Sequence, residues 1–217
     1  STVSGGLNMT AGNGDIAGTN DMFNFAYQQR RGDFDVKVRI AKLDFADTWT
    51  MASLMARSNL TPATTYAAVC ATPSIAGAFF RYRTNTATIP QGSGSFPVNY
   101  PYTWLRLERI GGTTFNGYAS IDGETWTKLG TATLAMPSII YLGFTVSSST
   151  DASTVHAEFR DFQDNTSTAL GLPPTANEPL GPSSRRTGLA ITEIMYNPAP
   201  RVDNRNIEFI ELHNSNP

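Results

Sequence analysis

Short runs in which apolar and polar residues alternate recur along the first 164 residues. FDVKVRI (34–40) places Phe and three aliphatic residues on one face, and TWLRLERI (103–110) and AFFRYR (78–83) alternate in the same way. This period of two is typical of a strand with one buried face. MASLMAR (51–57) and YAAVCAT (66–72) are more uniformly apolar, as in central strands. With no helical period before residue 165, the pattern predicts an all-β sandwich of antiparallel strands.

Turn residues separate these runs. Gly111-Gly112 and Asp122-Gly123 each predict a hairpin, because both positions of such turns accept positive φ cheaply. Residues 82–104 contain Gly and Ser with Pro97 and Pro101, and they predict a longer loop.

The stretch SIDGETW (120–126) resembles the Asp-box of sialidases, but one residue is missing between Asp122 and Gly123. A propeller would repeat the box at regular spacing, and here it occurs once. We therefore interpret the stretch as a hairpin turn.

The composition divides the chain into three parts. Residues 1–164 hold the predicted strands, and residues 165–187 are rich in Pro, Ser, Thr and Gly, as in a linker. Residues 188–217 contain two further strand-like runs around a polar loop, too few residues to fold alone. They predict a partial hairpin of a second domain, lying against the sandwich or pairing with another chain.

Charge and cysteine content narrow the classes of partner and chemistry to be expected. The net charge is −2 and charged residues make up 16%, without the basic patch that nucleic acid or an anionic membrane requires. No run approaches the roughly 18 apolar residues of a membrane span. The single Cys70 lies in an apolar run and predicts a buried, inert thiol. The chain begins at Ser1 without a signal peptide, which we interpret as a mature or excised piece.

Taken together, residues 15–162 resemble the concanavalin A-like modules of large secreted bacterial proteins, in the laminin-G and DUF1349-like group. ITEIMYNPAP and EFIELHN, within residues 191–214, resemble the opening of a lamin tail domain. The resemblance implies a two-sheet jelly roll, an extracellular or cell-surface location in a bacterium, and carbohydrate held on the concave face or the edge loops. Some relatives hold a structural calcium ion.

Candidate ligand contacts are aromatic rings that stack on sugars and guanidiniums that bind hydroxyls. The arginines alternate along strands and are expected to share one sheet face without paired carboxylates. The structural alternative is that they lie flat across an exposed sheet. The candidates are Trp49, Arg57, Arg81, Arg83, Tyr100, Tyr102 and Arg106.

Calcium is the one metal to consider, because it takes six to eight oxygen ligands. Asp15, Asp21 and Asp161 converge if the first and last strands pair. The favoured alternative is that these aspartates cap turns.

Catalysis is not expected. The Glu-x-Asp-x-Glu strand of related glucanases is absent, and Glu108, Glu124 and Glu158 lie on separate segments. His156 is the sole histidine before residue 165, and it does not suggest a catalytic triad.

We therefore expect a non-catalytic accessory module of a large exported bacterial protein that binds carbohydrate weakly and contacts neighbouring domains. The alternatives are a structural or adhesive spacer without a small ligand and, less favoured, a glycoside hydrolase. No cofactor is expected unless calcium binds.

Overall fold

The computed structural model describes residues 1–150, 153–166, 189–195 and 209–214. The chain divides into two compact units, Ser1–Thr166 and Ser167–Pro217. The described residues of both units form strands and no helix, and none forms a segment able to cross a membrane as a helix. The strands are β1 (Thr2–Val3), β2 (Gly6–Ala11), β3 (Asn24–Arg31), β4 (Phe34–Leu43), β5 (Met51–Arg57), β6 (Tyr66–Ala71), β7 (Ala78–Arg83), β8 (Gln91–Phe96), β9 (Thr103–Ile110), β10 (Thr114–Ser120), β11 (Thr127–Thr133), β12 (Ile139–Ser147), β13 (Val155–Asp164), β14 (Leu189–Met195) and β15 (Phe209–Asn214).

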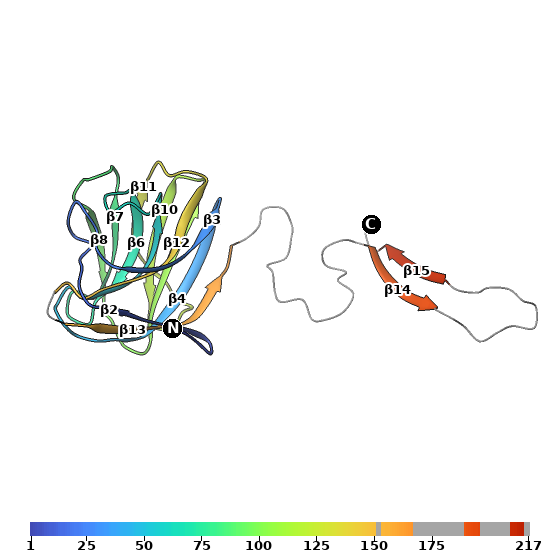
Figure 1. The fold of residues 1–217 in the computed structure, drawn as a ribbon, viewed down its shortest axis with the longest axis horizontal. Helices are drawn as coiled ribbons and strands as arrows, with labels where there is room; N and C mark the ends of the chain where they lie inside the picture. The colour runs from blue at the N-terminus through green and yellow to red at the C-terminus, as the bar shows by residue number, and fades with distance from the viewer. Residues whose placement is uncertain (151–152, 167–188, 196–208, 215–217) are drawn as a thin grey trace, which may run out of the picture. The chain divides into compact units, whose positions relative to one another are not determined.

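The first unit is a sandwich of two antiparallel sheets (Figure 1). The seven-stranded sheet has the order β1-β2-β13-β4-β9-β10-β11, and the six-stranded sheet has the order β3-β12-β5-β6-β7-β8. Strands near the two ends of the unit pair with each other, since β2 lies beside β13 and β3 beside β12. The prediction of an all-β, two-sheet antiparallel jelly roll is confirmed.

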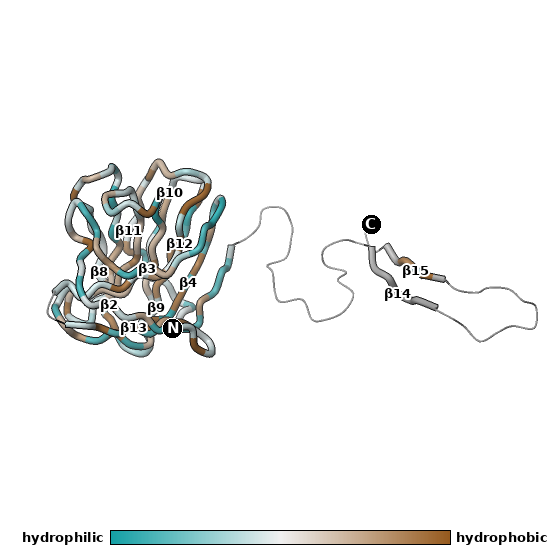
Figure 2. The backbone as a smooth tube through the Cα atoms, in the orientation of Figure 1, coloured by the Kyte–Doolittle hydropathy of each residue, from teal (hydrophilic) through white to brown (hydrophobic). Residues whose placement is uncertain are grey.

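The main core lies between the two sheets. Phe34, Val36, Val38 and Ile40 of β4 are buried there, and the polar residues between them are partly exposed, as the alternation predicts. In Figure 2 the apolar colour follows strands such as β4. Because each strand contributes every second residue to this layer, burial of these side chains fixes the register of the sheet.

The outer face of the six-stranded sheet is also buried over much of its area. Residues 14–23, which we call the strap, run from β2 to β3 and cross this face (Figure 1, dark blue). Ile16 of the strap is fully buried against Met51, Met55 and Tyr66, and the Tyr66 hydroxyl donates a hydrogen bond to the Ile16 carbonyl at 3.1 Å. Both faces of β5 and β6 are thus covered, which explains why these two strands are buried throughout and mostly apolar.

The region predicted to be a long loop contains a strand. Residues 91–96 form β8, an edge strand that pairs with β7. Its sequence, QGSGSF, has no large alternating apolar residues, so the pattern gave no strand signal. Gly94 has a φ of 74°, and a Cβ there would lie 2.5 Å from the Leu129 carbonyl oxygen of β11. Glycine at position 94 therefore allows β8 to approach β11 closely.

The Asp122-Gly123 turn joins β10 to β11, as predicted, but residues 121–126 make it longer than a two-residue hairpin. The Asp122 carboxylate accepts hydrogen bonds from the backbone N–H groups of Glu124 and Thr125, both at 2.8 Å. The Ser120 hydroxyl donates a further one. These bonds, with that of Glu124 the strongest, lower the pKa of Asp122. The aspartate side chain thus organises a wider turn than Asp-Gly alone predicts.

Cys70 is fully buried on the outer face of β6, and burial raises the pKa of its thiol. Because the thiolate is the reactive form, we expect native Cys70 to resist a thiol reagent such as 5,5′-dithiobis(2-nitrobenzoate). Labelling should proceed at the rate of unfolding and become complete in denaturant. Rapid labelling of the folded protein would show that the strap opens readily.

In the second unit, β14 pairs with β15 to form a two-stranded antiparallel sheet. Ile210 and Leu212 of β15 are exposed, at 61% and 57% of their surface. The remaining residues of the predicted linker and hairpin loop, 167–188 and 196–208, lie outside the described residues. Assignment of residues 188–217 to a lamin tail domain stays a prediction.

Candidate functional site

Two of the predicted ligand-binding arginines are buried in an ion-pair cluster. The Asp21 carboxylate of the strap accepts hydrogen bonds from Arg83 at 2.6 and 2.8 Å and from Arg57 at 3.0 Å. The side chain of Arg57 is 2% exposed and that of Arg83 is fully buried. The expectation that these arginines lack carboxylate partners is therefore wrong, since the strap supplies one.

Backbone carbonyls complete the shell of both guanidiniums. Arg83 donates to the carbonyls of Gly18 and Thr88, and Arg57 donates to that of Thr61. Burial lowers the pKa of Arg57 and raises that of Tyr66, whose ring lies 5.0 Å from the Arg83 guanidinium carbon. These contacts satisfy the charges within the protein, so the cluster fastens the strap to β5 and β7.

The three aspartates considered as calcium ligands are engaged separately. Asp21 binds the two arginines, Asp161 pairs with Arg39 at 2.7 Å, and Asp15 accepts the backbone N–H groups of residues 16 and 17. The pairing of β2 with β13 therefore does not bring them to one ion. The part of the chain that the structure describes contains no group of three or more acidic, histidine or cysteine side chains that could hold a metal.

Arg106 lies on the seven-stranded sheet, whereas the other three candidate arginines lie on the six-stranded sheet. The prediction that all four share one face is therefore wrong for Arg106. It projects from β9 and binds both oxygens of Asp35 at 2.7 Å, and this bond raises the pKa of Arg106. Glu108, opposite Asp35 in the neighbouring strand, accepts hydrogen bonds from Asn116 and Tyr118. This network occupies the outer face of the seven-stranded sheet.

The two candidate tyrosines of the β8–β9 connection differ in exposure. The Tyr100 hydroxyl donates to the Thr72 carbonyl at 2.8 Å, and burial raises the pKa of this tyrosine. Tyr102 is 57% exposed. Tyr100 is thus held as a structural contact, and Tyr102 is accessible to a ligand.

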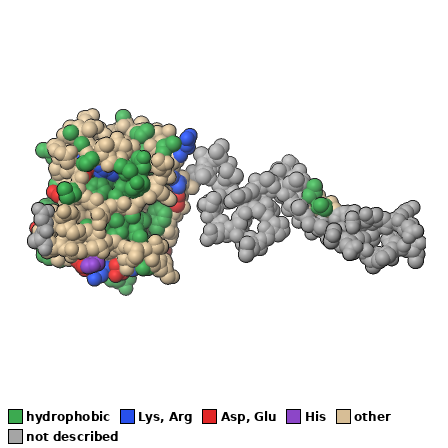
Figure 3. Space-filling model, viewed as in Figure 1, with side chains coloured by type: hydrophobic (Ala, Val, Ile, Leu, Met, Phe, Trp, Pro, Cys, Tyr) green, Lys and Arg blue, Asp and Glu red, His purple; other side chains and the backbone are tan. Residues whose placement is uncertain are grey.

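Trp49 and Arg81 come together around a third residue, Phe79. The rings of Trp49 and Phe79 meet edge to face with centroids 6.3 Å apart, and the Arg81 guanidinium carbon lies 5.1 Å from the Phe79 centroid. Trp49 is 49% exposed and Phe79 is 8% exposed. We call these three residues the Trp49 patch. Figure 3 shows hydrophobic side chains gathered over the middle of the visible face of the sandwich.

Arg81 differs in its partners from Arg57 and Arg83, which both bind Asp21. The Arg81 guanidinium donates to the Met51 sulfur at 3.8 Å, and a thioether is a weak acceptor. No carboxylate among the described residues forms an ion pair with it. Its N–H donors are therefore available to a ligand.

A hydrogen-bonded turn holds Trp49 in place. The backbone N–H of Trp49 donates to the Asp47 carboxylate at 2.8 Å, and the Thr50 hydroxyl donates to the Ser148 carbonyl at 2.9 Å. The Ser74 hydroxyl donates to the Thr48 carbonyl from the neighbouring loop. These bonds fix the backbone from which the Trp49 ring projects, so less conformational entropy is lost in this turn when a ligand binds.

Sequence reasoning missed Phe79 as part of the patch. The alternation in AFFRYR placed Phe79 on the same face as Arg81, and that placement is confirmed by the contact between them. The missing information was the position of Trp49, which depends on the fold of the β4–β5 loop.

No protein-family model matches the chain, and no curated protein sequence matches it. A functionally unknown protein from Saccharomyces cerevisiae has a similar structure, with a TM-score of 0.60 and 15% identity over 77% of this chain and 91% of that one. The GH43 BlXynB protein from Bacillus licheniformis has a TM-score of 0.57 and 12% identity over 73% of this chain, and the match spans 32% of BlXynB. The carbohydrate-binding module CBM66 from Bacillus subtilis has a TM-score of 0.45 and 15% identity. The first two likenesses show that about three quarters of this chain shares its fold with the yeast protein and with about a third of BlXynB.

Proposed function

We propose that the chain is a non-catalytic accessory module of a larger exported protein and that it binds carbohydrate at the Trp49 patch. One observation carries this proposal: a half-exposed tryptophan and an arginine that forms no ion pair with the described carboxylates both pack against Phe79. Exposed aromatic rings that present a flat face, together with free planar donors, suit the apolar faces and hydroxyl rims of sugars.

The chemistry of Arg81 narrows the ligand class. A guanidinium binds carboxylates through two parallel hydrogen bonds, and it also donates to hydroxyls. The patch therefore suits hydroxyl-rich glycans and favours those that carry a uronic acid. Salt weakens binding of an acidic glycan more than that of a neutral one, which separates the two ligand types.

The carboxylates of the sandwich support binding rather than hydrolysis. Asp35 and Glu108 are opposite each other, but Arg106 holds Asp35 with two hydrogen bonds and Glu108 accepts two others. A glycosidase needs one carboxyl group that gives its proton to the leaving group. Because Arg106 engages both oxygens of Asp35, this carboxyl group is poorly placed to give a proton to a leaving group.

Replacing the patch residues tests the proposal. A glycan array with the whole chain should identify a bound sugar, and titration calorimetry should measure its affinity. Trp49→Ala and Arg81→Ala should each weaken binding at least about tenfold, or about 1.4 kcal/mol, because each removes a central contact. Phe45→Ala is the matched control, since Phe45 is an exposed aromatic of the same loop, at 67%.

Each other outcome points to a different function. If no glycan binds the native protein, the spacer alternative replaces our proposal, and the covered face of the six-stranded sheet favours that reading. Binding that survives both patch substitutions would move the site elsewhere. Release of reducing sugar from a bound glycan would make the protein a hydrolase.

A further inference from the structure

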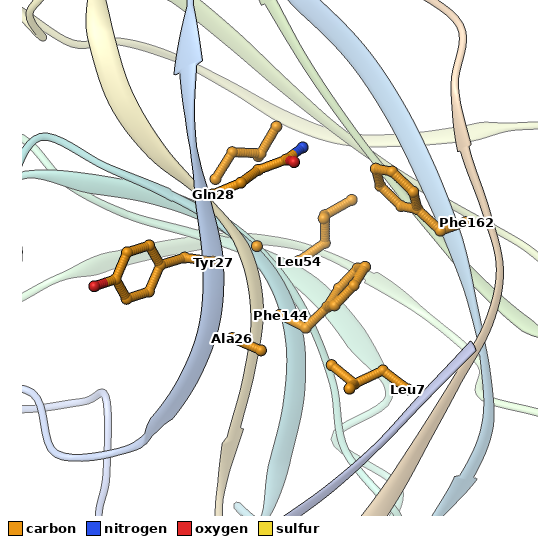
Figure 4. A pocket seen from close by; sticks show the side chains of 9 residues that line it. Leu7, Ala26, Tyr27, Gln28, Leu54, Phe144 and Phe162 are labelled. Carbon is orange, nitrogen blue, oxygen red and sulfur yellow. The ribbon is translucent and has the colours of Figure 1, made fainter. Parts of the chain in front are cut away.

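An apolar pocket opens between the two sheets at the edge formed by β3. Its cavity volume is about 290 Å³. Leu54 and Phe144 of the six-stranded sheet line its inner part, and Leu7 of β2 and Phe162 of β13 close it from the other sheet (Figure 4). We call it the edge pocket. It is separate from the Trp49 patch, since the two share no residue.

The walls of the edge pocket are well fixed. The Phe144 ring stacks on Phe159 with centroids 4.8 Å apart and meets Phe162 edge to face at 5.5 Å. Leu54 is fully buried, whereas Phe162 is 42% exposed at the mouth. Protein interiors contain few voids larger than a water molecule, and a smaller apolar cavity of about 150 Å³ binds benzene. The edge pocket therefore has the size and lining of a site for an apolar group.

Gln28 contributes a polar side chain to the lining of the edge pocket. Gln28 of β3 extends toward the pocket, whereas the neighbouring Tyr27 ring points away from it (Figure 4). The Gln28 side-chain amide forms no hydrogen bond with the described residues. An amide offers both donors and an acceptor, which suits a hydroxyl or carbonyl group.

The charges beside the pocket are already neutralised. Arg30 lies two residues after Gln28 on β3, and Asp164 lies two residues after Phe162 on β13. They form an ion pair at 2.5 Å that joins the same two strands that wall the pocket. Because the two charges neutralise each other, neither is left to attract a charged head group. A ligand with a neutral head is therefore favoured.

We propose that the edge pocket binds the aliphatic chain of a neutral amphiphile, with its hydroxyl or carbonyl group hydrogen-bonded to Gln28. The cavity corresponds to roughly ten water volumes of about 30 Å³ each, the space of a medium-length chain. Such a chain loses its contact with water against Leu54, Phe144 and Phe162. This site does not depend on carbohydrate binding.

The experiment uses the whole chain with 1-octanol as the probe, followed by titration calorimetry and backbone amide shifts. Saturable one-to-one binding is expected, with shifts confined to β3, β12 and β13. Sodium octanoate should bind at least about tenfold more weakly, because its carboxylate would lose water at the pocket while the nearby Arg30 is already paired with Asp164. Gln28→Ala should weaken octanol binding several-fold.

Ala26→Leu fills the pocket from β3 and should weaken octanol binding at least tenfold while the circular dichroism spectrum stays unchanged. Phe162→Asp removes an apolar ring from the exposed mouth and adds a charge there, so it should also weaken octanol binding. It replaces Ala26→Leu if that variant does not fold. Trp49→Ala is the control and should bind octanol as the native protein does. Octanol that fails to saturate, binds equally well to both pocket variants, or binds more weakly than octanoate would overturn the proposal.

Discussion

Replacing Asp21 with asparagine should lower the free energy of unfolding of the first unit by about 3–5 kcal/mol. The substitution keeps the size of the side chain but removes the one carboxylate between Arg57 and Arg83, whose side chains are 2% and 0% exposed. Two guanidiniums would then remain buried without a counter-charge. A domain of ordinary size is stable by about 5–15 kcal/mol, so this loss is a large share. Urea unfolding followed by tryptophan fluorescence measures it.

Asp15→Asn is the matched control, since Asp15 belongs to the same strap and its carboxylate accepts backbone N–H groups. Asparagine caps such groups almost as well as aspartate, so the loss should stay below about 1 kcal/mol. Equal stability of the two variants would mean that the strap is not fastened through Asp21. The Asp21 variant should also label faster at Cys70, because the strap covers that face.

Phe80→Ala should cost about 3–5 kcal/mol, because it removes a fully buried ring from the centre of the core. The ring fits against two glycines of the opposite sheet. A Cβ at Gly117 would lie 2.4 Å from the Phe80 ring, and one at Gly130 would lie 3.0 Å from it. Thermal unfolding monitored by circular dichroism measures the effect.

The same contact predicts a coupling between the two positions. Gly117→Ala alone should destabilise by about 1–3 kcal/mol, because the core has no room for the added methyl group. In the Phe80→Leu background the smaller side chain leaves space, so the added cost of Gly117→Ala should fall. The part that remains reflects Val69, whose Cγ2 would lie 3.0 Å from the new Cβ. Strict additivity of the two substitutions would contradict the packing described here.

The sequence was sufficient to predict most of the sheets, because burial imposes the alternation that is read from it. β4 and β9 follow the period of two, and β5 and β6 are mostly apolar because they are covered on both sides. β8 was not predicted because glycines and serines make up most of it and Phe96 is its one large apolar residue. An edge strand whose backbone packs against a neighbouring strand needs no apolar pattern.

The candidate site was harder to predict, because a charged residue looks the same in sequence whether it is exposed or paired. Arg57, Arg81 and Arg83 alternate along similar strands, yet two of them bind Asp21 and the third does not. The difference depends on the strap, which forms no strand, so no apolar pattern in the sequence predicts where it lies. The edge pocket also left no signal, since it arises from the spacing between two sheets.

The order of the strands also has a consequence for how the protein is made. Thr10 pairs with His156, and Gln29 pairs with Tyr141, so the earliest residues meet partners more than a hundred positions later. A ribosome adds on the order of 5–20 residues per second, so these strands wait several seconds for their neighbours. Such distant pairing also slows folding itself. The nascent amino-terminal edge must therefore stay soluble until synthesis of β13 is complete.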